Sequence, residues 1–337
     1  MAAWLLACCA LVFAIVAVGG ITRLTHSGLS IVEWQPLVGA VPPLNEAEWR
    51  DTFAQYRATP EFRLRNFGMT LDGFKRIFWW EYGHRLLGRV IGVVFLVPFL
   101  WFLARRAISP PIAWRLAGIF ALGGLQGALG WFMVKSGLVD DPRVSSVRLA
   151  AHLGTAFLIY ASMLWLALGL ALGFRRREPP HRAHIHAAVL APMVFVMVLT
   201  GALVAGIHAG AAYNTWPSMN GDFIPPGLWV IEPWWMNFVN NITLVQLDHR
   251  PLAYAIAVVA LALAWRVLRD ASSRMKERRW AWALAIAVTL QVAAGITLLL
   301  LRVPLALAAL HQSGAVIVFT CALGLLHALT RTEELQR

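Results

Sequence analysis

Four histidines stand within apolar stretches of the sequence, and they form two matched pairs. His84 (Glu-Tyr-Gly-His-Arg) is matched by His249 (Gln-Leu-Asp-His-Arg), and His152 (Ala-Ala-His-Leu-Gly) is matched by His311 (Ala-Leu-His-Gln-Ser). Imidazoles at membrane depth are uncommon and are candidate functional sites. Two imidazoles on facing helices are also the axial ligands that a heme iron takes in helical bundles. The pattern therefore predicts that these histidines ligate heme iron.

Eight apolar stretches must position these histidines. The chain has 337 residues, of which 59% are hydrophobic and 14% are charged, and about 20 apolar residues suffice to cross a bilayer core. The spans that the sequence predicts are 2–22, 83–103, 112–134, 149–173, 187–208, 250–268, 281–301 and 305–328. The stretch 23–80 is expected to be a loop with one short helix. The expected fold class is an all-α membrane protein with eight transmembrane helices.

The second half of the sequence repeats landmarks of the first half at fixed separations. The matched residues and their separations are His84 and His249 (165), Gln126 and Gln291 (165), His152 and His311 (159), and His26 and His208 (182). This repetition predicts a duplication into two pseudo-symmetric four-helix bundles, 1–175 and 183–330, joined by a linker at 175–182. Because each half has an even number of spans, both halves have the same orientation in the membrane.

The formal charge of +12 does not predict a nucleic-acid partner, because the basic residues form no patch interleaved with aromatic residues. They gather instead in the short connections 105–115, 175–182 and 269–279. The positive-inside rule places these connections and both termini in the cytoplasm, and the four histidines near the outer face. The short N-terminus without an Arg-rich presequence favours a bacterial inner membrane. His181, His184 and His186 lie in a basic connection and are expected to be solvated.

Glu81 distinguishes the two halves. It lies three residues before His84, so both side chains share a helix face, and its counterpart 165 residues later is Gln246. A carboxylate at this position can move protons or stabilise a developing positive charge. We therefore expect chemistry in the N-terminal half and a permanent cofactor in the C-terminal half. Arg85 and Arg250 directly follow their histidines and are predicted to pair with heme propionates.

Six motifs together resemble one family over nearly the whole chain. They are GGITRLTHSGLS (19–30), EYGHR (81–85), LQGALGW (125–131), AAYNTWP (211–217), DHRP (248–251) and LHQSG (310–314). In these motifs the sequence resembles the heme A synthase family of alphaproteobacteria and mitochondria. Some members carry a cysteine pair in the first outer loop, which this sequence lacks, so no thiol role is transferred to that loop.

The resemblance implies an enzyme that oxidises the C8 methyl group of heme O to a formyl group in two successive oxidations, giving heme A for cytochrome oxidase. It implies that His249 and His311 hold a heme B cofactor. It also implies that His84 and His152 take the substrate heme beside a catalytic Glu81. The implied partners are heme O synthase, which delivers the substrate, a ferredoxin-like or quinol electron donor, and the lipid bilayer. The oxygen source and a homo-oligomeric state are left open.

The histidines also allow three other functions: zinc binding, electron transfer and heme transport. Zinc takes four close ligands, often including cysteine, and Cys8, Cys9 and Cys321 lie in other parts of the apolar spans. A transmembrane diheme electron carrier would hold two permanent hemes and leave the porphyrin unchanged, but it gives no reason for a glutamate in only one half. A heme transporter or chaperone would move heme without altering it. The two heme-handling alternatives stay open at this point.

Overall fold

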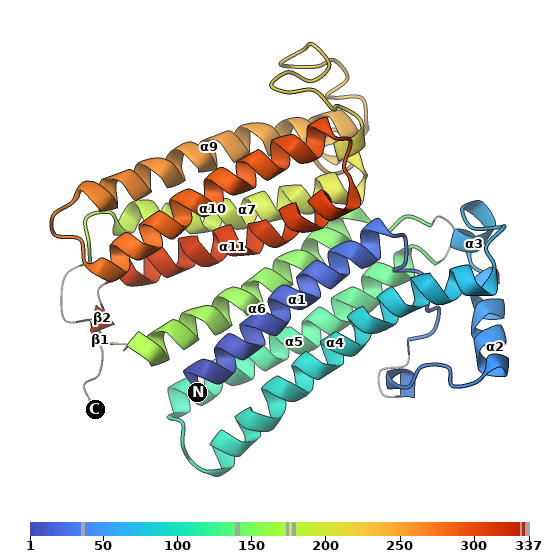
Figure 1. Ribbon diagram of the computed structural model, residues 1–337, viewed down its shortest axis with the longest axis horizontal. Helices are drawn as coiled ribbons and strands as arrows, with labels where there is room; N and C mark the ends of the chain where they lie inside the picture. The colour runs from blue at the N-terminus through green and yellow to red at the C-terminus, as the bar shows by residue number, and fades with distance from the viewer. Residues whose placement is uncertain (35–37, 139–141, 173–174, 177–179, 331, 334–337) are drawn as a thin grey trace. The chain divides into compact units, whose positions relative to one another are not determined.

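A computed structural model describes residues 1–34, 38–138, 142–172, 175–176, 180–330 and 332–333 of the chain (Figure 1). Within these ranges, eight helices are long and apolar enough to cross a membrane. They are α1 (Ala2–Leu24), α4 (Leu71–Ala104), α5 (Pro110–Ser136), α6 (Ser146–Leu172), α7 (His184–Gly206), α9 (Ile242–Arg269), α10 (Met275–Leu300) and α11 (Leu305–Leu329). The predicted all-helical, multi-pass membrane fold is confirmed, and each helix overlaps its predicted span, although α4 and α9 begin 12 and 8 residues earlier than predicted.

The remaining elements are short. They are η1 (Val38–Ala40), α2 (Glu46–Arg57), α3 (Pro60–Leu64), η2 (Ala209–Ala211), η3 (Trp234–Met236) and α8 (Asn237–Asn240), with the two-residue strands β1 (Arg175–Arg176) and β2 (Thr332–Glu333). The strands pair antiparallel, with Arg175 opposite Glu333. Part of the predicted linker, residues 177–179, lies outside the described residues.

The chain divides into two compact units, Leu11–His152 and a second unit of Met1–Ala10 with Leu153–Arg337. In the second unit, α7 packs against α9, α9 against α10, α10 against α11, and α11 against α7. These four helices lie side by side and close a four-helix bundle (Figure 1). In the first unit, α4 packs against α5 and α2. The division of the sequence into halves 1–175 and 183–330 stays a prediction.

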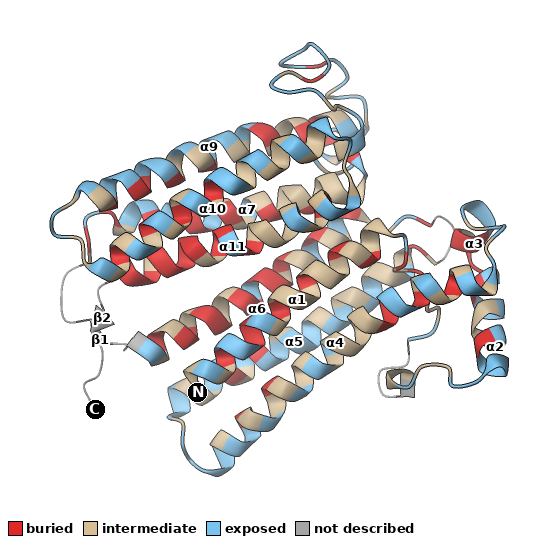
Figure 2. Ribbon diagram, in the orientation of Figure 1, coloured by how far each residue is buried: buried red, intermediate tan, exposed pale blue. Residues whose placement is uncertain are grey.

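Apolar side chains on the outward faces of the long helices fit a lipid environment. Val97 on α4 is 60% exposed, Val258 on α9 is 68% exposed and Leu290 on α10 is 64% exposed. Figure 2 shows such exposed positions recurring along α9 and α10, whereas buried residues dominate the C-terminal part of α11. Lipid tails cover apolar faces that water would not, and a helix satisfies its own backbone hydrogen bonds. The exposed apolar faces are therefore consistent with an integral membrane protein.

Helix α4 is longer than a bilayer requires. Its 34 residues span about 50 Å at roughly 1.5 Å per residue, against a hydrocarbon core of about 30 Å. The turns before His84 pack with α2 and α3 in an aromatic cluster of Trp49, Tyr56, Phe62, Phe74, Phe78 and Tyr82. The expectation of a loop with one short helix at 23–80 is therefore corrected to two short helices and an early start of α4.

His181 also differs from expectation, because it is buried rather than solvated. Its Nδ1 accepts a hydrogen bond from the backbone N–H of Ala183 at 3.0 Å, and its Nε2 lies 3.2 Å from Oδ2 of Asp270. Hydrogen bonds from Ser272 lower the pKa of Asp270 below its ordinary value, which keeps this acceptor ionised. The imidazole therefore fastens the start of α7 to the connection between α9 and α10.

Glu61 in α3 makes the stability of this region depend on pH. Its side chain is buried, Oε2 has no hydrogen-bond partner, and burial raises the pKa of the carboxyl above its ordinary value. A raised folded-state pKa means that the folded state loses stability as pH rises from the unfolded pKa, about 4.3, through the folded value. We expect Glu61→Gln to slow amide hydrogen exchange in α2 and α3 at pH 7, with the difference shrinking as pH falls toward 4.

Glu46→Gln is the matched control, because Glu46 is an exposed carboxylate of α2 that pairs with Arg50. It should change exchange in this region little at either pH. Equal exchange in wild type and Glu61→Gln across the pH range would contradict the account of Glu61.

Candidate functional site

His84 and His152 lie together in the unit Leu11–His152, close enough to interact electrostatically. His84 comes from α4, and His152 lies in the first two turns of α6. Each imidazole faces a glycine of a neighbouring helix. A Cβ added at Gly19 would lie 2.8 Å from His84 Nε2, and one added at Gly130 would lie 3.0 Å from His152 Cε1. Each imidazole therefore occupies the space that a Cβ would fill if Gly19 or Gly130 were any other residue.

His249 and His311 form the second pair, within the bundle of α7, α9, α10 and α11. A Cβ added at Gly201 would lie 3.3 Å from His249 Cε1, and one added at Gly295 would lie 2.8 Å from His311 Cε1. The hydroxyl of Thr200 lies 2.9 Å from His249 Nδ1. The second pair therefore lies against glycines in the same way as the first.

The glycines repeat at the separations that the sequence showed for other landmarks. Gly201 follows Gly19 by 182 residues, the separation of His26 and His208, and Gly295 follows Gly130 by 165, the separation of Gln126 and Gln291. Sequence reasoning missed these four glycines, although the equal separations could have found them. The repeated contacts are consistent with the predicted duplication.

Unsatisfied imidazole nitrogens suit a heme at both pairs. Within the described residues, Nδ1 of His152 and Nδ1 of His311 are buried without a hydrogen-bond partner, at matching positions of the repeat. A buried polar group without a hydrogen-bond partner is costly, so a purely structural role with all hydrogen bonds made does not account for these two histidines. No three His, Cys, Asp or Glu side chains gather as a metal site in the described ranges. Paired imidazoles beside glycines fit a porphyrin iron, which needs only two protein ligands.

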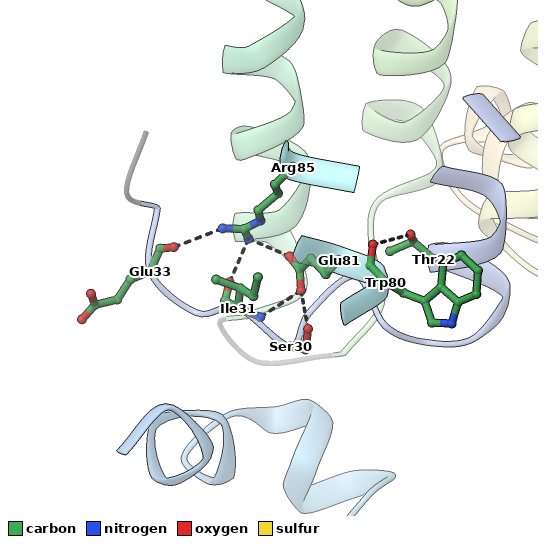
Figure 3. Close-up of polar contacts among 7 residues, drawn as sticks. All are labelled: Thr22, Ser30, Ile31, Glu33, Trp80, Glu81 and Arg85. Carbon is green, nitrogen blue, oxygen red and sulfur yellow. Dashed lines mark hydrogen bonds and ion pairs between the residues drawn. The ribbon is translucent and has the colours of Figure 1, made fainter. Parts of the chain in front are cut away.

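Glu81 is the centre of a polar cluster one turn before His84 (Figure 3). It is 2% exposed. Its Oε2 accepts hydrogen bonds from the Ser30 hydroxyl at 2.7 Å and from the Ile31 backbone N–H at 2.8 Å. Its Oε1 forms an ion pair with Arg85 at 2.6 Å. The carboxylate therefore joins the loop after α1 to the helix that carries His84.

Arg85 completes this connection through main-chain oxygens. Its guanidinium donates to the Ile31 carbonyl at 2.8 Å and to the Glu33 carbonyl at 3.1 Å, as Figure 3 shows. The Thr22 hydroxyl of α1 also donates to the carbonyl of Trp80, the residue before Glu81 in α4, at 3.2 Å. Ser30 and Ile31 belong to the site. Sequence reasoning missed their contact with Glu81, and the one available signal was the motif 19–30, which ends at Ser30 and directly precedes Ile31.

The second histidine pair has a similar connection between a loop and the helix that carries His249, but with an amide in place of the carboxylate. Gln246, the counterpart of Glu81, donates to the Tyr213 carbonyl at 3.1 Å, and its own Oε1 is buried without a partner. Arg250, the counterpart of Arg85, donates to the carbonyls of Tyr213 at 3.0 Å and Thr215 at 3.1 Å. Both arginines therefore hold loop carbonyls, and their contact with heme propionates stays a prediction.

Comparison with known proteins agrees with these motifs. Residues 2–323 match the family model COX15-CtaA, described as cytochrome oxidase assembly protein. A heme A synthase of Nitrosospira multiformis is 52% identical, covering 98% of this chain and 94% of its own. A heme A synthase of Nitrosomonas eutropha is 50% identical, covering 96% and 92%, and one of a Bradyrhizobium species is 49% identical, covering 95% and 88%. The chain therefore belongs to the COX15-CtaA family of cytochrome oxidase assembly proteins.

Proposed function

We propose that this chain is a heme A synthase, an oxidoreductase that converts the C8 methyl group of heme O to a formyl group. The observation that carries the proposal is the difference between Glu81 and Gln246 beside two otherwise matching histidine pairs. Relatives named heme A synthase over nearly the full length support it. Turning a methyl into an aldehyde takes two successive two-electron oxidations. The first gives an alcohol, and the second gives a gem-diol that loses water.

In this proposal the two histidine pairs bind different hemes. His249 and His311 hold a resident heme B, and when bound this heme supplies one-electron redox chemistry. His84 and His152 hold the substrate heme beside Glu81. Glycines under all four imidazoles leave the rings free of a clashing Cβ, which supports ligation at both pairs.

Glu81 holds or moves protons in the N-terminal pair. Its helix position places it on the face of His84, and its three hydrogen-bonding and ionic partners fix where its oxygens lie. The Ser30 hydroxyl, which donates to Oε2 at 2.7 Å, gives that oxygen a hydrogen-bonded neighbour for proton exchange. The amide of Gln246 cannot act as an acid or base, so the C-terminal pair lacks this capacity.

The proposal extends to partners and orientation. An even number of spans, as the eight candidate helices of the described residues suggest, supports placing both termini on one side. Arg105, Arg106 and Arg115 beside the α4–α5 connection favour the cytoplasm for that side. The histidine pairs then lie near the outer face of a bacterial inner membrane. Heme O synthase delivers the substrate, and a ferredoxin-like or quinol donor exchanges electrons with the protein.

Hemes extracted from cells that make heme O, with and without this chain, test the function directly. We expect new heme A on chromatography with the wild-type chain. His84→Ala and His152→Ala should abolish heme A while the purified protein keeps its resident heme. His249→Ala and His311→Ala should lose both, because the iron loses an axial ligand.

His186→Ala is the control for these variants, because His186 is an exposed histidine near Arg266. It should leave heme A and resident heme unchanged. Unaltered heme O with two permanently bound hemes would instead establish an electron carrier, and relocated but unaltered heme would establish a transporter.

Glu81→Gln separates the carboxylate from the ligands. It gives the N-terminal pair the amide that the C-terminal pair has, so we expect resident heme to remain and heme A formation to fall by about 10²-fold or more. Glu33→Gln is the control, since Glu33 binds Arg85 through its backbone carbonyl, which the substitution keeps (Figure 3). Full heme A production by Glu81→Gln would contradict the role proposed for this carboxylate.

Gly295→Ala tests whether the contact between Gly295 and the His311 ring positions this proposed iron ligand. The added methyl would lie 2.8 Å from His311 Cε1, and overpacking of this kind costs about 1–3 kcal/mol. We expect a displaced imidazole, seen as lower resident heme content and an altered Soret band. Gly127→Ala on α5 meets nothing within 4 Å and should keep a wild-type spectrum. Identical spectra for both variants would show that the glycine contact does not position the ligand.

A further inference from the structure

A recess lies beside the N-terminal histidine pair, where α5 ends and α6 begins. It has a volume of about 420 Å³ and is lined by Trp131, Phe132, Lys135, Ser136 and Arg148. Two of these five residues are cationic and two are aromatic, which distinguishes the recess from the apolar surfaces of the spanning helices.

Both cations of the recess lie over aromatic rings. The guanidinium carbon of Arg148 is 3.6 Å from the centroid of the Phe132 ring, and its NH1 donates to the Phe132 carbonyl at 2.8 Å. The ammonium of Lys135 is 5.2 Å from the ring centroid of Trp131. Among the ion pairs of the described residues, none joins a carboxylate to Lys135 or Arg148. Both cations are therefore held in place at the edge of the recess by the aromatic rings.

The recess is placed next to the iron ligand His152. Arg148 precedes His152 by one turn of α6, about 6 Å along the axis, and Lys135 follows Gly130 by about 7–8 Å along α5. Gly130 is the residue that faces the His152 ring. Because α5 and α6 are antiparallel neighbours, both cations are displaced from the imidazole toward the same end. A heme carries its two propionates on one edge, so a heme bound at His152 with that edge toward this end would bring its carboxylates to Lys135 and Arg148.

The loop held by Glu81 borders the same recess. The ring of Trp34 lies 5.7 Å from the ring of Trp131, centroid to centroid. Leu29 packs on Gly137, where an added Cβ would lie 2.9 Å from its Cδ1. The segment 29–34 thus runs from the Glu81 cluster to the recess, and the two belong to one continuous site.

The two cations of the recess are not repeated at the matching positions of the C-terminal half. The residues 165 positions after Trp131, Phe132 and Lys135 are Ile296, Thr297 and Leu300, and the residue 159 positions after Arg148 is Leu307. Neither cation is therefore retained beside His311. The recess is a property of the half to which the proposed function assigns the exchangeable substrate.

We propose that Lys135 and Arg148 bind the propionate carboxylates of the substrate heme. This inference rests on the proposed function, because it assigns the ligand of the N-terminal pair. The chemistry recognised is an anionic oxygen group, which a phospholipid phosphate also carries. A propionate is distinguished by being covalently part of the molecule whose iron binds His152, so its esterification must weaken heme binding.

Binding of heme O and of its dimethyl ester to the full-length protein in nanodiscs tests the proposal. Soret titrations compare wild type, Lys135→Gln, Arg148→Gln and the double variant, each carrying its resident heme. We expect wild type to bind the free acid roughly tenfold or more tightly than the ester, since charge-assisted hydrogen bonds are the stronger class. The double variant should weaken the free acid to the level of the ester and leave ester binding unchanged.

Lys75→Gln is the matched control, because Lys75 also lies over a tryptophan, 5.5 Å from the ring of Trp49, outside the recess. It should preserve the preference for the free acid. Equal affinity of wild type for acid and ester would overturn the proposal, as would equal weakening of both ligands in the double variant. A different result would assign the recess to lipid phosphate: heme binding would depend on anionic lipid, the double variant would abolish that dependence, and wild type would show no preference for the free acid over the ester.

The proposed function is read separately in the same preparations by heme A formation. If the wild-type protein makes heme A but binds heme O and its dimethyl ester equally well, only the proposed role of the recess is refuted. Wild type that binds the free acid preferentially but never makes heme A refutes the synthase assignment.

Discussion

An imidazole held between two membrane-spanning helices needs a facing surface without a Cβ, and the rest of this molecule depends on that constraint. Gly19, Gly130, Gly201 and Gly295 each provide such a surface for one of the four histidines. In lipid there is little hydrophobic force between helices, so close approach at small residues is the main source of their packing. The same contacts that bring helices together therefore also define where a ligand ring lies.

Around this common frame the two histidine pairs differ in charge. One turn before His84 stands a buried carboxylate with hydroxyl, amide and guanidinium partners, whereas one turn before His249 stands the amide of Gln246. Lys135 and Arg148 of the recess are likewise replaced by Leu300 and Leu307 at the matching positions of the C-terminal half. The two pairs thus share a similar frame of histidines and glycines, and a few polar residues distinguish them.

The long helices and the histidine pairs were predictable because both follow from local patterns, apolar length and repeated motifs. What the sequence did not predict depends on contacts between distant segments. The burial of His181 needs Asp270, which lies 89 residues later. The early start of α4 needs the aromatic side chains of α2 to cover Phe74 and Phe78. Ser30 becomes part of the Glu81 cluster only when the chain folds back across 51 residues.

Arg85 and Arg250 hold their loops by main-chain carbonyls. A bond to a carbonyl oxygen does not depend on which side chain the loop residue carries. The two loops are accordingly very different in content: one contains the helices α2 and α3, and the other is rich in tryptophan and proline. Each half could thus acquire a new covering sequence after duplication without losing the anchor to its ligand helix. Side chains in these loops that make no contact with the site can therefore differ between the halves, while each arginine keeps its hydrogen bonds to the loop main chain.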